Sequence, residues 1–459
     1  MCIRDSLDIE LESYQMTSVE NSIQKNITLE PNQRINLEEE ITIPNSLENT
    51  SAYWLKEKGS LGMYNVKDQK LIGKPETPRA IYVTFNINFK GTTIPFTKPV
   101  VYRYSKPDKG ELYRPFEIVP PVSASITDKV FIFDTDNQRD IEVIVKAGKD
   151  NIEGFVQMAY PNDWSVFPAK QKIEIANKGD VQTLTFTVIP PKNQSEGLIT
   201  PMVNIDGKFY TRELVEIDYD HIPFQTVYLP SESKLVRLDI DKRGNTIGYI
   251  EGAGDVVPES LRQIGYNVSI IEPSKINAET ISNFDAIVIG IRAYNILDEL
   301  KFKQKYILDY VKEGGNLIIQ YNTNRRLKVE NIAPYDLQLS RDRVTDENAE
   351  IRILEPDHPI LNFPNKITKN DFEGWVQERG LYFPNKWAKE FIPLLSANDE
   401  GESPKEGSLL VAKYGKGNYI YTGLSFFREF PAGVPGAYRL FANLLSAGKE
   451  NPQNTNFKD

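Results

Sequence analysis

Short stretches of alternating apolar and polar residues follow one another through the first half of the chain. Residues 80–89 place two isoleucines, a valine and two phenylalanines on one face, which is typical of a half-buried strand. A Lys-Gly turn follows, and residues 92–104 continue as further strand. Such strands at regular spacing, without a long helical period, predict two antiparallel β-sandwiches, at residues 19–118 and 119–222.

The second of these units contains a tryptophan in a recognisable setting. Trp164 lies in the run Pro-Asn-Asp-Trp-Ser-Val at residues 161–166. This run resembles the sequence of bacterial immunoglobulin-like modules that stand beside sugar-processing domains. The resemblance implies an immunoglobulin-like sandwich for residues 119–222.

The pattern changes in the second half, where continuous apolar runs alternate with helical segments. The runs at residues 246–250, 284–290 and 316–321 are typical of strands buried on both faces. Between them, residues 299–313 have a helical pattern that two glycines end. This alternation predicts a parallel sheet covered by helices on both faces, over residues 223–448.

Two end segments lie outside these units. The opening residues 1–6, Met-Cys-Ile-Arg-Asp-Ser, lack the apolar core and the cleavage site of a signal peptide. They resemble a translated sequencing adapter, which leads us to expect a natural protein that extends upstream. We expect residues 1–18 to be an artefactual or disordered start and residues 449–459 to be a polar tail.

Composition narrows the classes of function. The net charge of -10 disfavours a nucleic-acid partner, and no apolar run is long enough to span a membrane. Cys2 is the only cysteine, and His221 and His358 are the only histidines, so a disulfide framework and a site with three imidazoles are excluded. His358 stands close to two carboxylates, but no second histidine is near, and we favour a loop turn over a metal ligand. We expect no cofactor in this chain.

Ligands bind at the carboxyl ends of the strands in an open α/β sheet, and this rule selects several loops. The first carries Glu251 and Asp255 with two glycines, a sequence that suits either ligand binding or a tight turn with an Asp cap. The second carries Arg292, Tyr294 and Asn295, whose donors and ring suit a sugar or a carboxylate. A loop salt bridge with a packed tyrosine explains the second loop equally well.

The strand at residues 314–320 gives a more specific resemblance. Its sequence, Gly-Gly-Asn-Leu-Ile-Ile-Gln, resembles the strand that leads to the nucleophile elbow of class I glutamine amidotransferases. The catalytic cysteine of that family would fall within residues 320–322, Gln-Tyr-Asn, none of which forms a useful nucleophile at neutral pH. Residues 423–429 match the family's Phe-His-Pro-Glu motif, but Phe427 stands where the base would be. The resemblance implies a flavodoxin-like α/β domain without catalytic residues.

The densest polar cluster lies at residues 371–380. Trp375 with the nearby Glu373 and Glu378 offers the stacking surface and hydrogen-bond partners that a pyranose ring requires. The same carboxylates could act as acid and base in glycoside hydrolysis, and a solvated loop with one anchoring tryptophan is the plainer alternative. We therefore predict no catalytic residue and a ligand-binding rim made of Glu251, Asp255, Arg292, Tyr294, Asn295, Tyr321, Asn322, Glu373, Trp375, Glu378 and Arg428.

A larger resemblance covers nearly the whole chain. Taken in order, the two sandwiches and the segments at residues 290–295, 371–380 and 423–429 resemble the C-terminal region of large PIG-L (LmbE-like) deacetylases from Bacteroidetes-type bacteria. In that family a separate N-terminal domain uses zinc to remove the acetyl group from N-acetylglucosaminyl substrates, with a His-Pro-Asp-Asp signature. Here the His-Pro pair at residues 358–359 is followed by Ile-Leu. The resemblance therefore implies an accessory region without the zinc domain.

The resemblance also implies a setting and partners. It implies a periplasmic or extracellular protein that binds an N-acetylated glycan and serves an upstream deacetylase domain of the same chain. The main hypothesis is a noncatalytic module that binds carbohydrate or positions substrate. Two alternatives stay open: a glycan hydrolase that uses strand-end carboxylates, and a structural interaction module.

Overall fold

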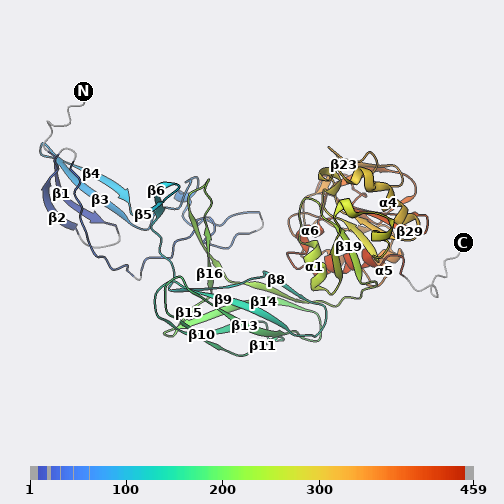
Figure 1. Cartoon of the computed structure of the whole chain (residues 1–459), viewed down its shortest axis with the longest axis horizontal. Helices are drawn as coiled ribbons and strands as arrows, with labels where there is room; N and C mark the ends of the chain where they lie inside the picture. Colours follow the sequence, from blue (N-terminus) through green and yellow to red (C-terminus); the bar gives the residue numbers. More distant parts are fainter. Residues whose placement is uncertain (1–8, 18–21, 31–32, 45, 61, 450–459) are drawn as a thin grey trace, which may run out of the picture.

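The computed structural model describes residues 9–17, 22–30, 33–44, 46–60 and 62–449. Three parts follow one another along the long axis of the molecule (Figure 1): an N-terminal sheet, a central sandwich and a C-terminal α/β domain. The protein is therefore multidomain and rich in β-sheet. No helix among the described residues has the length and apolar character needed to cross a membrane.

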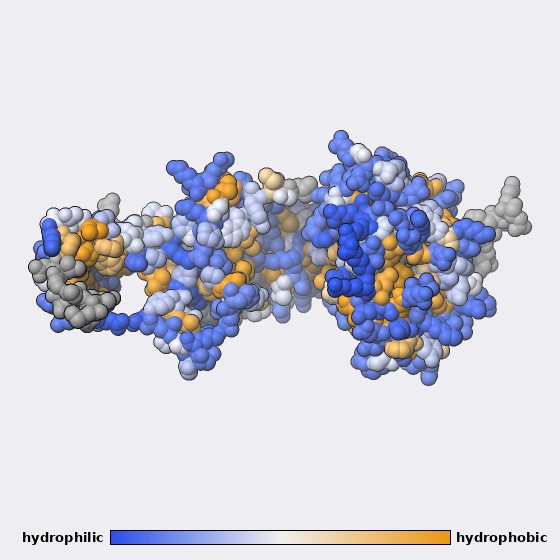
Figure 2. All heavy atoms as spheres, turned by 90° about the horizontal axis from the view of Figure 1, so that it is seen from above, coloured by the Kyte–Doolittle hydropathy of each residue, from blue (hydrophilic) through white to orange (hydrophobic). Residues whose placement is uncertain are grey.

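The N-terminal part is built on one antiparallel sheet with the strand order β2-β1-β3-β4. Its strands are β1 (Ile9–Met16), β2 (Ser22–Thr28), β3 (Tyr82–Phe89) and β4 (Thr92–Pro99). A separate hairpin follows, made of β5 (Val101–Lys106) and β6 (Gly110–Pro115). Hydrophobic atoms are visible on the surface of this part in Figure 2, where Ile94 and Phe96 are among the exposed side chains.

This part departs from the predicted sandwich at residues 19–118. The strand β1 begins inside the expected disordered start of residues 1–18, of which residues 1–8 lie outside the described residues. The described residues between β2 and β3 form only the short helix η1 (Gln69–Leu71) and no strand, so they supply no second layer. Charged residues and prolines interrupt that stretch, and residues 33–40 are all exposed instead of packing as a second layer.

The central part is a two-layer sandwich. One sheet has the order β12-β10-β14-β18-β8, with β15 paired to β14, and the other has the order β11-β13-β9-β7. The strands are β7 (Val122–Ile126), β8 (Val130–Phe133), β9 (Arg139–Ala147), β10 (Ile152–Ala159), β11 (Ser165–Phe167), β12 (Gln171–Ile175), β13 (Val181–Ile189), β14 (Ser195–Ile205), β15 (Lys208–Tyr210) and β18 (Ser233–Arg237). Trp164 is buried between the sheets, where its Nε1–H donates to Ser195 Oγ at 3.1 Å.

The sandwich continues past the predicted boundary at residues 222 and 223. β16 (Arg212–Ile217) and β17 (Gln225–Pro230) leave it as a separate antiparallel ladder. The chain then returns in β18, which pairs with β14 and runs parallel to β8. The sequence pattern misplaced the boundary because β18, Ser-Lys-Leu-Val-Arg, has only two apolar residues and gives no clear strand signal.

The sandwich and the α/β domain share a packed boundary. Ile132 on β8 and Val236 on β18 belong to the core of the α/β domain, whereas their neighbour Leu235 points into the sandwich. Lys242 forms an ion pair with Asp134 at 2.7 Å across this boundary. Alternate side chains of the same strands thus complete two different cores, since successive residues of a strand face opposite sides.

The C-terminal domain contains a seven-stranded sheet with the order β20-β19-β21-β22-β29-β28-β26. The first five strands are parallel, and β28 and β26 add an antiparallel edge. The sheet strands are β19 (Thr246–Ile250), β20 (Asn267–Ile270), β21 (Ala286–Ile289), β22 (Asn316–Ile319), β26 (Phe391–Pro393), β28 (Leu409–Tyr414) and β29 (Gly417–Thr422). The strand and helix pattern predicted from the sequence is confirmed in this domain.

Helices and small ladders surround this sheet. The helices are α1 (Val257–Gln263), η2 (Pro273–Lys275), α2 (Ala278–Ile281), α3 (Ala293–Ile296), α4 (Leu300–Lys312), α5 (Pro359–Asn362), η3 (Lys369–Phe372), α6 (Phe426–Glu429) and α7 (Pro435–Ser446). The remaining strands are β23 (Leu337–Val344) with β25 (Gly380–Trp387), and β24 (Arg352–Ile353) with β27 (Leu395–Ser396). Gly380, the first residue of β25, forms a bridge with Leu424 just after β29, so this inserted ladder reaches the strand ends.

Candidate functional site

The carboxyl ends of four parallel strands meet at one edge of the α/β sheet, as the sequence predicts. Backbone hydrogen bonds tie their loops together: Ala253 N–H donates to Ile291 O at 2.8 Å, and Arg292 N–H donates to Tyr321 O at 2.9 Å. The strands β19, β21, β22 and β29 end at Ile250, Ile289, Ile319 and Thr422. We call the side chains at this edge the strand-end rim, with the members Glu251, Asp255, Arg292, Tyr321, Gln377, Glu378, Tyr382, Phe427 and Arg428.

Three aromatic rings form the centre of the strand-end rim. The Tyr321 and Tyr382 rings are stacked, with centroids 6.0 Å apart and planes within 9°. Phe427 also packs on Tyr321, with centroids 5.3 Å apart and planes tilted by 42°. Tyr321 is mostly buried, whereas Tyr382 and Phe427 are half-buried. The rim therefore presents partly exposed ring surface to which a flat, weakly polar ligand can pack.

Charged side chains flank the rings. Arg428 Nε donates to Glu378 Oε1 at 2.9 Å, and its guanidinium also donates to Gln377 and lies over the Phe427 ring. Burial raises the pKa of Tyr321, while the nearby positive charges of Arg292 and Arg428 oppose that shift. The positive charges of both arginines therefore lower the pKa of the Tyr321 hydroxyl, against the effect of burial.

Three rim residues hold backbone conformations that favour glycine. Arg292, Gln377 and Tyr382 have φ values of 57°, 68° and 53°. A residue other than glycine in this left-handed region costs about 1–3 kcal/mol and persists only where the surrounding structure imposes it. Strain of this kind clusters at ligand and active sites. Three strained residues on one rim indicate that these residues serve a role other than stability.

A buried polar chain lies beneath the rim. Gln320 Nε2 donates to Tyr249 Oη at 2.7 Å, and the Tyr249 hydroxyl lies 2.8 and 2.9 Å from the two carboxylate oxygens of Asp255, to which it donates. Burial raises the pKa of both Tyr249 and Asp255. Gln320, at the predicted elbow, is thus used to hold Tyr249 rather than to meet a substrate.

Two predicted ligand residues of the second loop are structural instead. The Tyr294 side chain is fully buried, and its hydroxyl donates to Gln304 Oε1 at 2.7 Å. Asn295 Nδ2 donates to Thr323 O and Arg325 O, and these bonds stabilise the loop that follows β22. The alternative of a packed tyrosine was the right one, because the one-turn helix α3 directs both side chains inward.

Asn322 also proves to be structural. Its side chain is fully buried, accepts from Tyr294 N–H at 3.0 Å, and donates to Gln320 O at 3.0 Å. These bonds hold the loop that leaves β22, and full burial keeps the amide out of reach of a ligand. The prediction that Asn322 binds a ligand is wrong.

Trp375 is a core residue rather than a stacking platform. It is 3% exposed, and its Nε1–H donates to Asp371 O at 2.9 Å. Its ring packs against Phe372 and Phe426, with centroids 5.6 and 5.9 Å away. The prediction of a sugar platform at Trp375 is wrong, and the plainer alternative of an anchoring tryptophan holds.

The predicted carboxylates occupy three kinds of environment. Glu251 and Glu373 are exposed, and neither forms an ion pair within the described part of the chain. Asp255 is half-buried and also accepts from Val257 N–H at 3.0 Å, which fits the predicted Asp cap. Glu378 is 7% exposed and held by Arg428.

Glu429 is a buried acid that sequence reasoning did not select. The side chain is fully buried, and its Oε2 accepts from Val376 N–H at 2.9 Å. Burial raises the pKa of Glu429 to about 8. The Ser425 hydroxyl donates to Glu378 O at 2.6 Å and lies 3.1 Å from Glu429 Oε1, so a protonated Glu429 can donate to Ser425 Oγ. Glu429 thus supports the loop that carries Gln377 and Glu378.

The residues present do not fit a metal site. His358 caps the start of α5, where its Nδ1 accepts from Ile360 N–H at 3.2 Å. Within the described ranges, no group of three or more His, Cys, Asp and Glu side chains is placed to hold a metal ion. The zinc that the family resemblance implies would therefore have no ligand set among these residues.

Comparisons with known proteins add little to this site. No family model matches the chain, and no curated protein matches it. Among solved structures, an exo-β-1,4-mannosidase from Opitutaceae bacterium strain TAV5 has 12% identity and a TM-score of 0.27, over 44% of this chain and 35% of the mannosidase. A family 123 glycoside hydrolase from Clostridium perfringens has 9% identity and a TM-score of 0.14, over 45% of this chain and 38% of the hydrolase.

Native α2-macroglobulin from Escherichia coli is a third similar structure. It has 11% identity and a TM-score of 0.19, over 26% of this chain and 17% of the macroglobulin fragment. The chain thus spans less than half the length of each of these three structures. At such TM-scores the likenesses carry no argument about fold or function.

Proposed function

We propose that this chain is the noncatalytic accessory region of a PIG-L (LmbE-like) N-acetylglucosaminyl deacetylase, and that its α/β domain binds carbohydrate at the strand-end rim. One observation carries the binding proposal: a cluster of partly exposed aromatic rings, one of them under the Arg428 guanidinium, lies at the carboxyl ends of parallel strands. The strand order of the five parallel strands supports a flavodoxin-like, class I glutamine amidotransferase-like fold. The sandwich with its buried Trp164 supports an immunoglobulin-like module.

The rim supports a saccharide as the ligand. The exposed ring surfaces of Tyr382 and Phe427 suit the C–H face of a pyranose. Arg292 supplies donors, and Glu251 and Asp255 supply acceptors, as hydroxyl and acetamido groups require. An N-acetylated glycan combines a ring with these groups.

Two features support a domain without amidotransferase chemistry. Gln320 donates to Tyr249 from the elbow position, and Phe427 packs on Tyr321 where the family places its base. No thiol or imidazole is present at either position. We assign zinc-dependent deacetylation to an upstream domain, and a periplasmic or extracellular location follows from the same family resemblance.

Calorimetric titration with N-acetylglucosamine oligomers and peptidoglycan fragments tests this proposal. We expect Tyr382→Ala and Arg428→Ala each to weaken binding by roughly tenfold, which corresponds to one lost stacking or charge-assisted contact. Tyr306→Ala is the matched control, because Tyr306 is an exposed tyrosine on α4, outside the rim. Absence of binding, or equal affinities for all four proteins, would refute the proposal.

A glycan hydrolase is the second candidate function. It is favoured by a pair of carboxyl groups in contrasting settings: Glu429 is held protonated by burial, and Glu378 is ion-paired with Arg428. Contrasting protonation is what an acid and a base require. This alternative predicts release of reducing sugar by the chain alone, lost on Glu378→Gln and on Glu429→Gln. The full burial of Glu429 makes the binding function the better supported one.

A further inference from the structure

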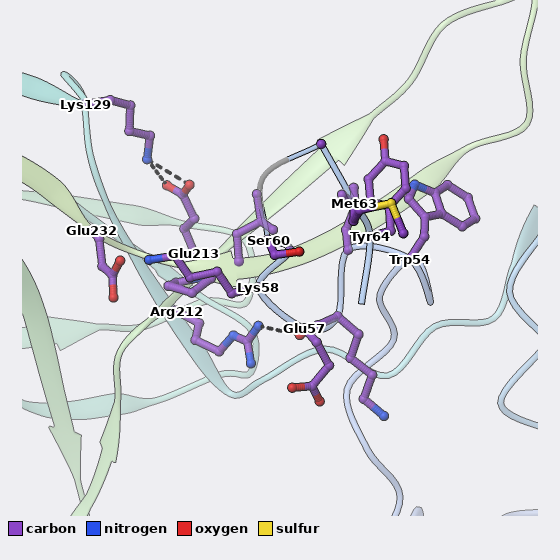
Figure 3. A pocket seen from close by; sticks show the side chains of 16 residues that line it. Trp54, Glu57, Lys58, Ser60, Met63, Tyr64, Lys129, Arg212, Glu213 and Glu232 are labelled. Atoms are coloured by element: carbon purple, nitrogen blue, oxygen red, sulfur yellow. Dashed lines mark hydrogen bonds and ion pairs between the residues drawn. The ribbon is translucent and has the colours of Figure 1, made fainter. Parts of the chain in front are cut away.

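A cavity lies far along the chain from the strand-end rim. It has a volume of about 730 Å³ and forms where residues 54–60 and 62–64 meet the ladder of β16 and β17. Figure 3 shows its two sides: Trp54, Met63 and Tyr64 gather on one, and Lys129, Glu213 and Glu232 on the other. We call this space the bipartite cavity. Its volume is in the usual range for small-molecule sites.

The charged side of the bipartite cavity is fixed in place. Lys129 Nζ donates to both carboxylate oxygens of Glu213, at 2.8 and 2.9 Å, and Glu213 is 8% exposed. Arg212 donates to Tyr228 O at 2.8 Å and lies over the Tyr228 ring. These contacts hold the floor of the cavity before any ligand arrives, which lowers the cost of ordering on binding.

The apolar side presents large side chains to the open cavity. Met63 and Tyr64 are each 69% exposed. Trp54 is half-buried and packs edge-on against Tyr53, with ring centroids 4.9 Å apart, so its ring is held in orientation. A backbone bridge between Ser60 and Met63 closes the turn that carries Met63. Exposed large apolar side chains gathered at one cavity are typical of binding sites.

The charges that line the cavity decide which ligand fits. Four cationic side chains and three anionic ones surround it, so a polyanion and a polycation are both disfavoured: Lys56, Lys58, Lys129 and Arg212 against Glu57, Glu213 and Glu232. Glu232 forms no ion pair within the part of the chain that the structure describes, and it can accept hydrogen bonds from a ligand. A ligand with ring faces and many hydroxyl groups matches both sides.

We propose that the bipartite cavity is a second saccharide site, which takes a neutral pyranose ring against Tyr64 and Trp54 with its hydroxyls on Glu232. This site goes beyond the proposed function, because it uses residues of the N-terminal and central parts instead of the α/β domain. It does not depend on the strand-end rim. Two separate sites would let one chain hold an extended glycan at two points, which raises the overall affinity.

A site-specific oxidation experiment tests this proposal. Met63 is exposed and is therefore readily oxidised by peroxide, whereas Met202 is half-buried on β14 and serves as the internal control. We expect millimolar neutral oligosaccharides of N-acetylglucosamine, glucose or mannose to slow the oxidation of Met63 roughly tenfold. The reason is that a sugar ring packed on Tyr64 and Trp54 covers the neighbouring Met63 and shields it from peroxide. The rate at Met202 should not change. Equal Met63 rates with and without every one of these saccharides would overturn the proposal.

Calorimetry with the same saccharides separates the two sites. In the Tyr382→Ala variant, in which binding at the strand-end rim is weakened, the saccharide that protects Met63 should still bind. Adding Tyr64→Ala or Trp54→Ala should abolish that binding, whereas adding Tyr219→Ala should not, because Tyr219 is a similarly exposed tyrosine outside the cavity. If Tyr64→Ala and Trp54→Ala leave the titration unchanged, the bipartite cavity is not the site, whatever the result at the rim.

Discussion

Glu429 is a carboxylic acid enclosed in the α/β core beside the strand-end rim. Its Oε2 accepts from Val376 N–H, and burial raises the pKa of the side chain from 4.5 to about 8. The native protein therefore holds this group protonated at neutral pH, while the unfolded chain ionises it. A carboxyl kept neutral in this way makes the stability of the domain depend on pH.

The sign of that dependence follows from the two pKa values. Because the folded pKa is the higher one, the stability that Glu429 contributes is complete below pH 4.5 and is lost as the pH rises to about 8. We expect Glu429→Gln, which keeps the shape but cannot ionise, to lose less stability over this window than the natural protein. Urea unfolding followed by tryptophan fluorescence at both ends of the window measures the difference. Parallel losses in the two proteins would contradict the buried, protonated state.

Trp375 yields a second prediction at the same scale. Since its ring is buried against Phe372 and Phe426, Trp375→Ala should lower the free energy of unfolding by about 3–5 kcal/mol. The folded fraction should still bind saccharide with unchanged affinity. Trp375→Phe, which keeps most of the packing, serves as the control. Weaker binding without a loss of stability would restore Trp375 to the ligand site.

Arg292 separates stability from binding. Its φ of 57° suits glycine, and its side chain is exposed. We expect Arg292→Gly to be more stable than Arg292→Ala by about 1 kcal/mol, since alanine keeps the left-handed penalty. Both variants should bind saccharide more weakly than the natural protein. Equal stability of the two variants, measured by thermal unfolding, would show that the strain is absent.

Among the structural elements, β18 does the most to join the parts of the molecule. It pairs with β14 and β8 in the sandwich while Val236 packs into the α/β core. This role was hidden in the sequence because a five-residue strand with only Leu235 and Val236 apolar does not reveal which sheet it joins. Several strands and helices of the α/β domain were predictable from their period and from the glycines that follow them, as with β21 before Gly290 and α4 before Gly314 and Gly315.

The shared boundary predicts that a small change on β18 affects the α/β domain. Val236→Ala removes two methyl groups from a fully buried position and should lower the stability of the α/β domain by roughly 1–3 kcal/mol. Val181→Ala on β13 is the matched control, because Val181 is 58% exposed. Hydrogen exchange in β19 and α1 reports the effect. Faster exchange with Val181→Ala but not with Val236→Ala would contradict the shared core.

At the scale of the whole molecule, the sequence predicted which strand ends come together but not which side chains line that edge. The rule that ligands bind at strand ends selected one edge of the sheet, and Arg292, Tyr321, Glu378 and Arg428 do lie together there. Tyr382 was not selected, because it comes from an inserted ladder whose position depends on long-range contacts. The cavity beside Trp54 escaped notice for the same reason, since its sides lie far apart in the sequence.

The central claim is that the strand-end rim of the α/β domain binds a glycan. A crystal structure of the chain with an N-acetylglucosamine oligomer tests it most directly. We predict a sugar ring packed on the half-buried Tyr382 and Phe427, with its polar groups on Arg292 and Arg428. A bound oligomer seated elsewhere in the α/β domain, or a rim left without sugar at saturating concentration, would contradict the account.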